Sequence, residues 1–274
     1  MGASKGFFSV DDQYAARHAL DRGFAVLSDV SLRNNGGQIM STQGATGELF
    51  ATETPTKPTG VTRRHAITDE ALANFETAYP NETITKQDIF YYIYGLLHSD
   101  DYKKRYADNL SKELPRIPCV KKFLDFWAFS QAGRDLAGLH VNYEVVSPYP
   151  VNFAGGELFM RNFTDADYRV EQMKFGKSGK VTDKTTVIYN HKITITNIPI
   201  EAYDYVVNGK PALEWVMERQ AVTTHKESGI VNDANLWATE TMGDASYPLK
   251  LFQRVITVSL ETMIIVRALP RLDI

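Results

Sequence analysis

The stretch from Thr85 to Glu144 constrains the fold most, because it alternates helix-forming runs with residues that end helices. Thr85 is placed to cap a helix, with its hydroxyl accepting a hydrogen bond from the amide of Asp88. The apolar residues that follow have the spacing of one buried helix face: Ile89, Phe90, Ile93, Leu96 and Leu97. Ser99 can cap a second helix immediately afterwards, which predicts a tight helix–helix corner.

The second helix is expected to place Tyr102, Tyr106 and Leu110 on one face and to stop before Pro115 and Pro118. A third helix is predicted over residues 121–139, with core contacts from Phe123, Trp127, Leu136 and Leu139.

Helices are also predicted on both sides of this stretch. Thr68 is a good N-cap, and Pro80 ends the helix that it begins. Pro211 suits the first position of a helix that runs to about Met217. Residues 249–269 form a long apolar helix, whose inner face is expected to hold Phe252, Val255, Ile256, Ser259, Met263 and Val266, widened by Ile264 and Ile265.

The periodicity changes from helical to alternating after Pro148 and Pro150, which predicts a β-rich part. Its expected strands cover residues 168–175, 185–189 and 193–198, and residues 190–192 are the turn between the last two. Residues 174–184 are predicted to form a flexible, basic tip. Nearer the N-terminus, residues 7–10 and 24–30 are candidate strands, 12–20 a short helix and 41–62 an exposed loop.

These elements predict an α+β fold. A helical scaffold, made of the helix–corner–helix and the long C-terminal helix, is combined with a small, mostly antiparallel β-sheet lobe. We expect an N-terminal α/β part with its exposed loop over 1–83, the helical scaffold over 84–147, a β-hairpin lobe over 148–200 and a C-terminal helical part over 201–274. Together they should form one compact domain.

Composition narrows the class of protein without naming it. The 274 residues are 43% hydrophobic and 23% charged, and no apolar run is long enough to span a membrane. The single cysteine, Cys119, excludes an internal disulfide and fits a reducing cytoplasm, where we expect a buried structural thiol. The net charge of −3 does not exclude nucleic-acid binding, because that needs only a local positive surface.

No sequence motif for catalysis or metal binding is present. Residues 176–180, GKSGK, resemble a phosphate-binding loop only superficially, since their spacing is wrong. The six histidines are scattered, and no two have the helical spacing of a metal pair. The sequence therefore predicts no catalytic residue, no metal and no cofactor in this chain.

Two basic segments are candidate contacts to nucleic acid. The tip carries Lys174, Lys177, Lys180 and Lys184, with only Asp183 opposing them, and could lie along a phosphate backbone. The loop before residue 65 ends in Arg63 and Arg64, and arginine can read guanine bidentately. The simpler alternatives are an exposed hairpin loop kept soluble by lysine and a plain surface loop.

Four stretches closely resemble the C-terminal specificity domain of type ISP (single-polypeptide) restriction–modification enzymes. They are ITKQDIFYYIYGLLHSDDYKKRYADNLSKELPRIP at 84–118, LAGLHVNYE at 136–144, TTVIYNHKITITNIPIEAYDYVVNGKPALEWVMERQAVTTHKESGIVNDANLW at 185–237 and RVITVSLETMIIVRALP at 254–270. They cover about half of the chain in the same order, whereas residues 1–83 match the family poorly.

The resemblance implies a DNA target-recognition domain that does no chemistry itself. The parent enzyme would carry a nuclease, a helicase-like ATPase and an adenine-specific methyltransferase, and would use S-adenosylmethionine, ATP and Mg²⁺. The implied partners are double-stranded DNA and the methyltransferase domain, and no membrane. A structural or inter-domain interaction module and a free-standing enzyme remain alternative interpretations.

Overall fold

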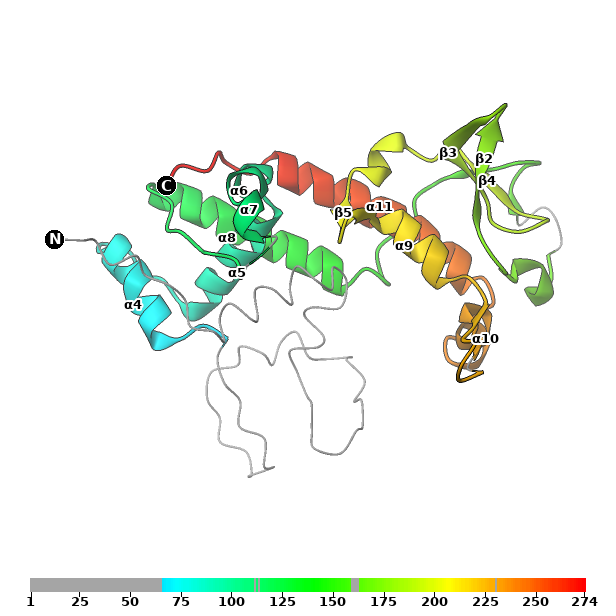
Figure 1. Cartoon of the computed structure of the whole chain (residues 1–274), viewed down its shortest axis with the longest axis horizontal. Coiled ribbons are helices and arrows are strands. Elements are labelled where there is room, and N and C mark those ends of the chain that lie inside the picture. The colour runs from blue at the N-terminus through cyan, green and yellow to red at the C-terminus, as the bar shows by residue number, and fades with distance from the viewer. Residues whose placement is uncertain (1–65, 111, 113, 159–162, 230) are drawn as a thin grey trace, which may run out of the picture. The chain divides into compact units, whose positions relative to one another are not determined.

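The computed structural model describes residues 66–110, 112, 114–158, 163–229 and 231–274 (Figure 1). The chain divides into two compact units. Of the described residues, those up to Val141 and those from Ile264 to Ile274 belong to unit 1, and those from Asn142 to Met263 belong to unit 2. The elements expected between residues 7 and 62 lie outside the described residues, as do Arg63 and Arg64.

Unit 1 is helical. The helices are α4 (Asp69–Ala78), α5 (Lys86–His98), α6 (Asp100–Arg105), α7 (Ala107–Leu110) and α8 (Phe123–Val141). Of these, α4, α5 and α6 begin at the caps that the sequence predicts. Thr68 caps α4 by accepting a hydrogen bond of 3.1 Å from the amide of Ala71. Thr85 caps α5 in the same way from Asp88, whose carboxylate in turn accepts from the amide of Thr85.

One residue, Ser99, forms the corner between α5 and α6. Ser99 ends α5, since its amide bonds the carbonyl of Leu96, and its side chain caps α6. The second helix is shorter than predicted, because the chain leaves helical geometry at Tyr106 and α7 forms a separate turn. Asp108 and Asn109 are poor helix formers, which is consistent with this break.

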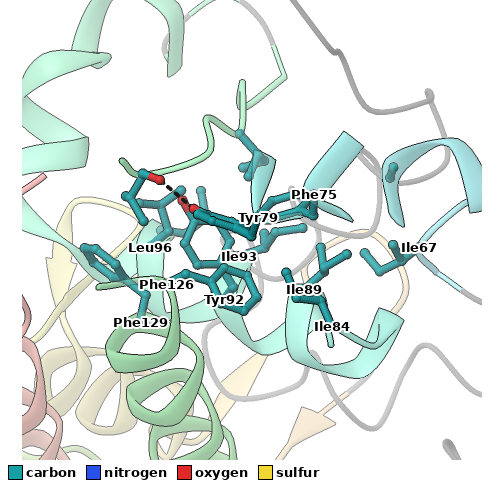
Figure 2. Packing of buried hydrophobic residues seen from close by; sticks show 14 of the residues in the cluster. Ile67, Phe75, Tyr79, Ile84, Ile89, Tyr92, Ile93, Leu96, Phe126 and Phe129 are labelled. Carbon is teal, nitrogen blue, oxygen red and sulfur yellow. Dashed lines mark hydrogen bonds between the residues drawn. The ribbon is translucent and has the colours of Figure 1, made fainter. Parts of the chain in front are cut away.

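The core of unit 1 is a cluster of aromatic rings between α4, α5 and α8 (Figure 2). Tyr92 stacks on Phe126, with ring centroids 4.9 Å apart, and meets Phe75 edge-on at 5.4 Å. Aromatic pairs of this kind contribute beyond the area they bury, by roughly 0.5–1.5 kcal/mol each. Phe123 and Trp127, expected in the core, are partly buried at its margin.

Three tyrosine hydroxyls of this core hold the segment that contains the two prolines. Tyr102 donates to the carbonyl of Arg116 at 2.7 Å. Tyr92 donates to that of Pro118 at 2.6 Å and Tyr79 to that of Val120 at 2.5 Å. Burial raises the pKa of each of these tyrosines, so the hydroxyls stay protonated and act as donors. Alternate carbonyls of the segment are thereby satisfied without secondary structure.

Helices α5 and α8 approach each other through glycines. A Cβ added at Gly95 would lie 2.2 Å from the carbonyl oxygen of Phe129, so only glycine fits there. A polar link crosses the same contact, because the carboxylate of buried Asp88 pairs with Arg134 at 2.5 Å. The hydroxyl of Ser130 also donates to the carbonyl of Asp88 at 2.9 Å.

The last residues of the chain belong to unit 1. The amide of Lys121 donates to the carbonyl of Asp273 at 2.9 Å, and the two side chains form an ion pair. Leu269, Leu272 and Ile274 pack against the aromatic core. Cys119 is half-buried beside this core, and burial raises the pKa of its thiol to about 11, as expected for a structural cysteine.

Unit 2 contains a four-stranded antiparallel sheet with the strand order β1-β4-β3-β2. Its strands are β1 (Asn152–Phe153), β2 (Lys174–Ser178), β3 (Val181–Ile188) and β4 (Thr194–Thr196). The turn predicted between the last two is confirmed, since the side chain of Asn190 accepts from the amides of Lys192 and Ile193. The strand predicted over 168–175 is wrong: the 3₁₀ helix η2 (Asp165–Tyr168) ends there, and β2 begins only at Lys174.

The irregular segment between η2 and β2 is stabilised by hydrogen bonds from a side chain, and not by backbone pairing with a neighbouring strand. Asn235 donates to the carbonyl of Val170 at 2.8 Å and accepts from its amide at 2.9 Å. Val170 is fully buried, so these bonds replace the strand pairing that its β-branched side chain suggested.

The rest of unit 2 is built from short elements and most of one long helix, whose residues from Ile264 on belong to unit 1. These elements are the 3₁₀ helix η3 (Ile200–Tyr203), β5 (Val206–Val207), β6 (Lys210–Pro211), α9 (Ala212–Arg219), β7 (Thr223–Thr224), β8 (Val231–Asn232), α10 (Ala234–Glu240) and the long helix α11 (Tyr247–Arg267). Asn208 and Gly209 join β5 to β6 with φ of 50° and 77°, the positive values of a type I′ turn. Most of the predicted inner face of α11 is buried, whereas Ile264 is 61% exposed.

The chain enters unit 2 alongside α11. The amide of Tyr149 donates to the carbonyl of Gln253 at 3.1 Å. Arg254 donates to the carbonyl of Val146 at 3.1 Å, and Thr257 to that of Ser147 at 2.9 Å. Residues 146–149 are therefore fastened to the helix through their backbone, although they form no regular structure.

The predicted fold class is confirmed: the protein is α+β, with a helix–corner–helix, a long C-terminal helix and small antiparallel sheets. Among the described residues, no helix combines the length and the apolar character that crossing a membrane requires.

Candidate nucleic-acid interface

The basic segment predicted as a flexible tip is an ordered two-stranded ribbon. Strands β2 and β3 pair antiparallel, with Lys177 opposite Thr182 and Ser178 opposite Val181. Gly179 and Lys180 make the two-residue turn, and only Gly179 has a positive φ, of 62°. Glycine at the first central position is typical of a type II′ turn, whose twist matches the flanking strands. The outer six residues of this ribbon, 177–182, are all exposed.

Three of the four candidate lysines are exposed on this ribbon. Lys174 and Lys177 lie on β2, Lys180 lies in the turn, and in the described part of the chain none of them forms an ion pair. Four other lysines of unit 2 are neutralised by ion pairs, which join Lys184 to Glu214, Lys192 to Asp167, Lys210 to Glu218 and Lys250 to Asp244. The ribbon therefore presents uncompensated positive charge.

Lys184 is placed differently from the other three lysines. Its ammonium group pairs with Glu214 at 2.8 Å and lies over the rings of Phe175 and Tyr203, 5.6 Å and 5.3 Å from their centroids. The hydroxyl of Tyr203 donates to the backbone carbonyl of Lys184 at 2.8 Å. These contacts fix the base of the ribbon against α9 and η3, so the structure separates an anchored base from an exposed outer part.

An irregularity in the pairing lies where the base meets the outer part. Phe175 pairs with Val187, but the next residue, Gly176, pairs with Asp183, so β3 carries extra residues there. A Cβ at Gly176 would lie 2.8 Å from the Cβ of Thr186, which explains the glycine.

The one acid of the ribbon is held by its own strand. The carboxylate of Asp183 accepts from the amide of Thr185 at 2.9 Å and from its hydroxyl at 2.6 Å. Hydrogen bonds from the side chains of Thr185 and Thr186 lower the pKa of Asp183. Asp183 is therefore engaged by threonines, and not by the lysines that it was expected to oppose.

Two candidate arginines and one further exposed residue complete the candidate interface. Arg63 and Arg64 lie outside the described residues. Sequence reasoning does not single out Val181, which is 69% exposed beside the turn of the ribbon. Its only sequence signal is that it is the one apolar residue among residues 177–182.

A histidine pair in unit 1, with His140 buried and His98 partly buried, is the other group of ionisable side chains that stands out. The Tyr94 hydroxyl shares a hydrogen bond of 2.8 Å with Nδ1 of His140, and Nδ1 of His98 bonds the carbonyl of Tyr94 at 2.8 Å. Burial lowers the pKa of His98 to about 4 and that of His140 to about 3. No group of side chains suited to holding a metal occurs in the described ranges.

Comparison with protein families identifies the class. The model of the type ISP C-terminal specificity domain matches residues 23–251. The chain therefore belongs to the family of type ISP C-terminal specificity domains, as the resemblance predicted. The match begins at residue 23, well before residue 84, so it reaches further into the N-terminal part than the four similar stretches do. A comparison with curated proteins found no match.

Three solved structures resemble the chain in fold. A nuclease-deletion mutant of the type ISP restriction–modification enzyme LlaGI, in complex with a DNA substrate mimic, is 41% identical, with a TM-score of 0.58 over 71% of this chain. The ATP-dependent type ISP restriction–modification enzyme LlaBIII bound to DNA is 38% identical, with a TM-score of 0.65 over 80%.

The third structure is a DrdV–DNA complex, 32% identical, with a TM-score of 0.64 over 79% of this chain. The matched regions are only 14% of the LlaGI chain, 14% of the LlaBIII chain and 21% of the DrdV chain. The chain thus corresponds to a small part of each of these proteins.

Proposed function

We propose that this chain recognises a specific double-stranded DNA sequence on behalf of a longer type ISP restriction–modification enzyme. The observation that carries the proposal is that the three similar structures are all complexes with DNA or a DNA mimic, while the chain belongs to the family of their specificity domains. The uncompensated lysines of the β2–β3 ribbon support it, because phosphate contacts supply much of the affinity of DNA-binding proteins.

The chemistry would belong to the rest of that enzyme. The parent would be an ATP-dependent endonuclease with an adenine-specific methyltransferase, working in the cytoplasm with S-adenosylmethionine, ATP and Mg²⁺. Methylating an adenine requires turning it out of the base stack, so the bound register must be fixed. The recognition domain would fix that register and would make its second contact with the methyltransferase domain.

Within the proposal, the candidate residues have two kinds of role. Lys174, Lys177 and Lys180 contact phosphates, which position the protein without reading sequence. Lys184 anchors the ribbon through Glu214 and adds only to the local field. Arg63 and Arg64 are candidates for base contacts, and changing one that reads a guanine would alter sequence preference, whereas a uniform loss of affinity would assign it to phosphate.

A domain exchange tests the proposed function directly. The specificity domain of LlaBIII is replaced by this chain, and the sequence context of every adenine that the chimera methylates is determined. We expect methylation at one new site that the unaltered LlaBIII ignores. Methylation only at the original LlaBIII site, in a folded chimera, would support a structural or inter-domain module instead. Selection of bound duplexes from a random pool by the 274-residue chain provides an independent measurement.

A further inference from the structure

We propose that the outer part of the β2–β3 ribbon reads the major groove of DNA, with Val181 contacting the methyl group of a thymine. The inference rests on the proposed function and deepens it by naming the groove, the reading element and the chemical group that is read. Its starting point is that residues 177–182 are exposed on both strands while the base of the ribbon is anchored at Lys184.

The dimensions of the ribbon suit one groove. Paired strands lie about 4.8 Å apart, and with their side chains they fill a groove about 12 Å wide, whereas the minor groove is about 6 Å wide. From Gly176 to the turn at Gly179, the ribbon extends about 10 Å at ~3.4 Å per residue. That length matches a major groove about 8.5 Å deep. The two-residue turn keeps the end of the ribbon narrow.

The charges of the ribbon are arranged for a groove and not for a flat surface. Lys180 is in the turn, and Lys177 is paired with Thr182 immediately behind it. Lysine side chains are long enough to reach phosphates on the walls of the groove when the ribbon lies between them. Asp183 sits behind these residues and is held by Thr185, so no acid faces the base edges from the outer six residues.

Val181 is the side chain of the ribbon that can distinguish one base from another. It pairs with Ser178 next to the turn, and it is 69% exposed although it is apolar. An exposed valine stabilises the free protein little, because burial is what makes an apolar side chain favourable. In the major groove, the thymine methyl is the one apolar group on a base edge, and apolar side chains recognise it.

Replacing thymine by uracil provides the test, since uracil pairs identically and lacks only that methyl group. The 274-residue chain is used to select duplexes from a random pool, and each thymine of the selected site is then replaced by uracil in turn. We expect one position at which wild-type affinity falls about 4-fold, the effect of leaving one methyl group unburied.

Two protein variants assign the effect to a residue. Val181→Ala should bind the thymine and uracil duplexes equally at that position. Val231→Ala is the matched control, because Val231 is also a valine on a strand of unit 2 and is 53% exposed. It should keep the wild-type sensitivity to uracil. Since both side chains are exposed, neither change is expected to unfold the protein.

The outcomes separate this inference from the function on which it rests. The inference is overturned if a site is selected and bound with steep salt dependence, but no thymine in it is sensitive to uracil, or if Val181→Ala keeps that sensitivity. A selected site without any thymine overturns it as well. In each of these cases the proposed function stands. If no duplex is enriched at all, the proposed function fails, and the inference fails with it.

Discussion

Gly133 of α8 lies so close to the carbonyl oxygen of Tyr91 in α5 that a Cβ built on it would be 1.8 Å from that oxygen. The neighbouring atom is backbone and cannot rotate away, so the two helices would have to separate. We therefore expect Gly133→Ala to lower the free energy of unfolding of unit 1 by about 3 kcal/mol, the upper end of overpacking costs.

Chemical denaturation followed by far-UV circular dichroism measures this change. Gly138→Ala is the control on the same helix, because a Cβ there meets nothing within 4 Å. Alanine is a better helix former than glycine, so that variant should be more stable by up to about 1 kcal/mol. Equal stability of the two variants would mean that the helices do not cross closely at Gly133.

The carboxylate of Asp88 performs two functions, as the partner of Thr85 in the α5 cap and as the partner of Arg134 on α8. Removing it leaves the guanidinium unpaired at a largely buried contact. We expect Asp88→Ala to destabilise unit 1 by about 3 kcal/mol, in the range found when one partner of a buried pair is deleted.

Thermal unfolding of the wild type and this variant gives the comparison. Asp69→Ala is a suitable control, because Asp69 also pairs with a basic residue, Lys86, but its side chain is 96% exposed. The control should lose far less stability, as surface pairs do. A loss of the same size in both variants would contradict the role assigned to burial.

His98, which is partly buried, and His140, which is buried, make unit 1 sensitive to mild acid. In the unfolded chain both titrate near pH 6.5, whereas in the folded chain burial lowers the pKa of His98 to about 4 and that of His140 to about 3. Below pH 6.5 the unfolded state therefore binds protons that the folded state does not. Stability should fall as the pH drops from about 6.5 towards 4, on the order of 1 kcal/mol per pH unit for each histidine.

Unfolding midpoints measured between pH 7 and pH 4.5 check this dependence. His98→Gln should reduce the slope by about half, since one of the two groups no longer titrates. His225→Gln changes an exposed histidine of unit 2 and should leave the slope unchanged. A wild-type slope near zero over this range would show that the pair is accessible to solvent.

Asn235 is expected to be the most sensitive polar position of unit 2. Its side chain satisfies both the amide and the carbonyl of buried Val170. Asn235→Ala leaves two backbone groups without partners, at a cost of about 2–3 kcal/mol. Hydrogen exchange at the amide of Val170 should accelerate in this variant, while Thr239→Ala, at an exposed position of the same helix, should leave that exchange as it is.

Neutralising the exposed lysines of the ribbon tests the phosphate contacts. The triple change Lys174→Gln, Lys177→Gln and Lys180→Gln should weaken binding to all duplexes alike and flatten its salt dependence. Each lost phosphate contact removes about 0.9 from the slope of log K against log salt concentration. Fluorescence anisotropy over a salt series measures both quantities.

The matched control removes the same total charge from exposed lysines of unit 1, at Lys104, Lys112 and Lys122. It should leave the salt slope nearly unchanged, because those lysines lie on elements that carry no proposed contact. If the two triple variants bind alike, the ribbon is not part of the interface.

The parts of the fold that the sequence predicts are those fixed by local chemistry. Thr68, Thr85 and Ser99 cap their helices through bonds that span only three residues, so the signal and its partner are adjacent in the chain. The turn at Asn208 and Gly209 also depends on local chemistry, because these residue types suit the positive φ values.

The parts that the sequence does not predict depend on distant partners. The ribbon strand β2 contains glycine and two lysines, which have low β-propensity, and only pairing with β3 makes it a strand. The run after Tyr168 looks like a strand, but Asn235, 65 residues away from Val170, takes the bonds that a neighbouring strand would supply. The separation of Lys184 from the other candidate lysines likewise depends on Glu214, on a different element.

Residues 146–149 run along α11 beside Gln253, Arg254 and Thr257, so the chain enters unit 2 next to the helix by which it leaves. Unit 2 is thus a continuous insertion within unit 1, with its two ends held together by its own hydrogen bonds. An insertion of this kind can be exchanged as a cassette, but only by recombination at both of its junctions. A single crossover would join the first part of one such unit to the last part of another and would separate residues 146–149 from the part of α11 that they bond.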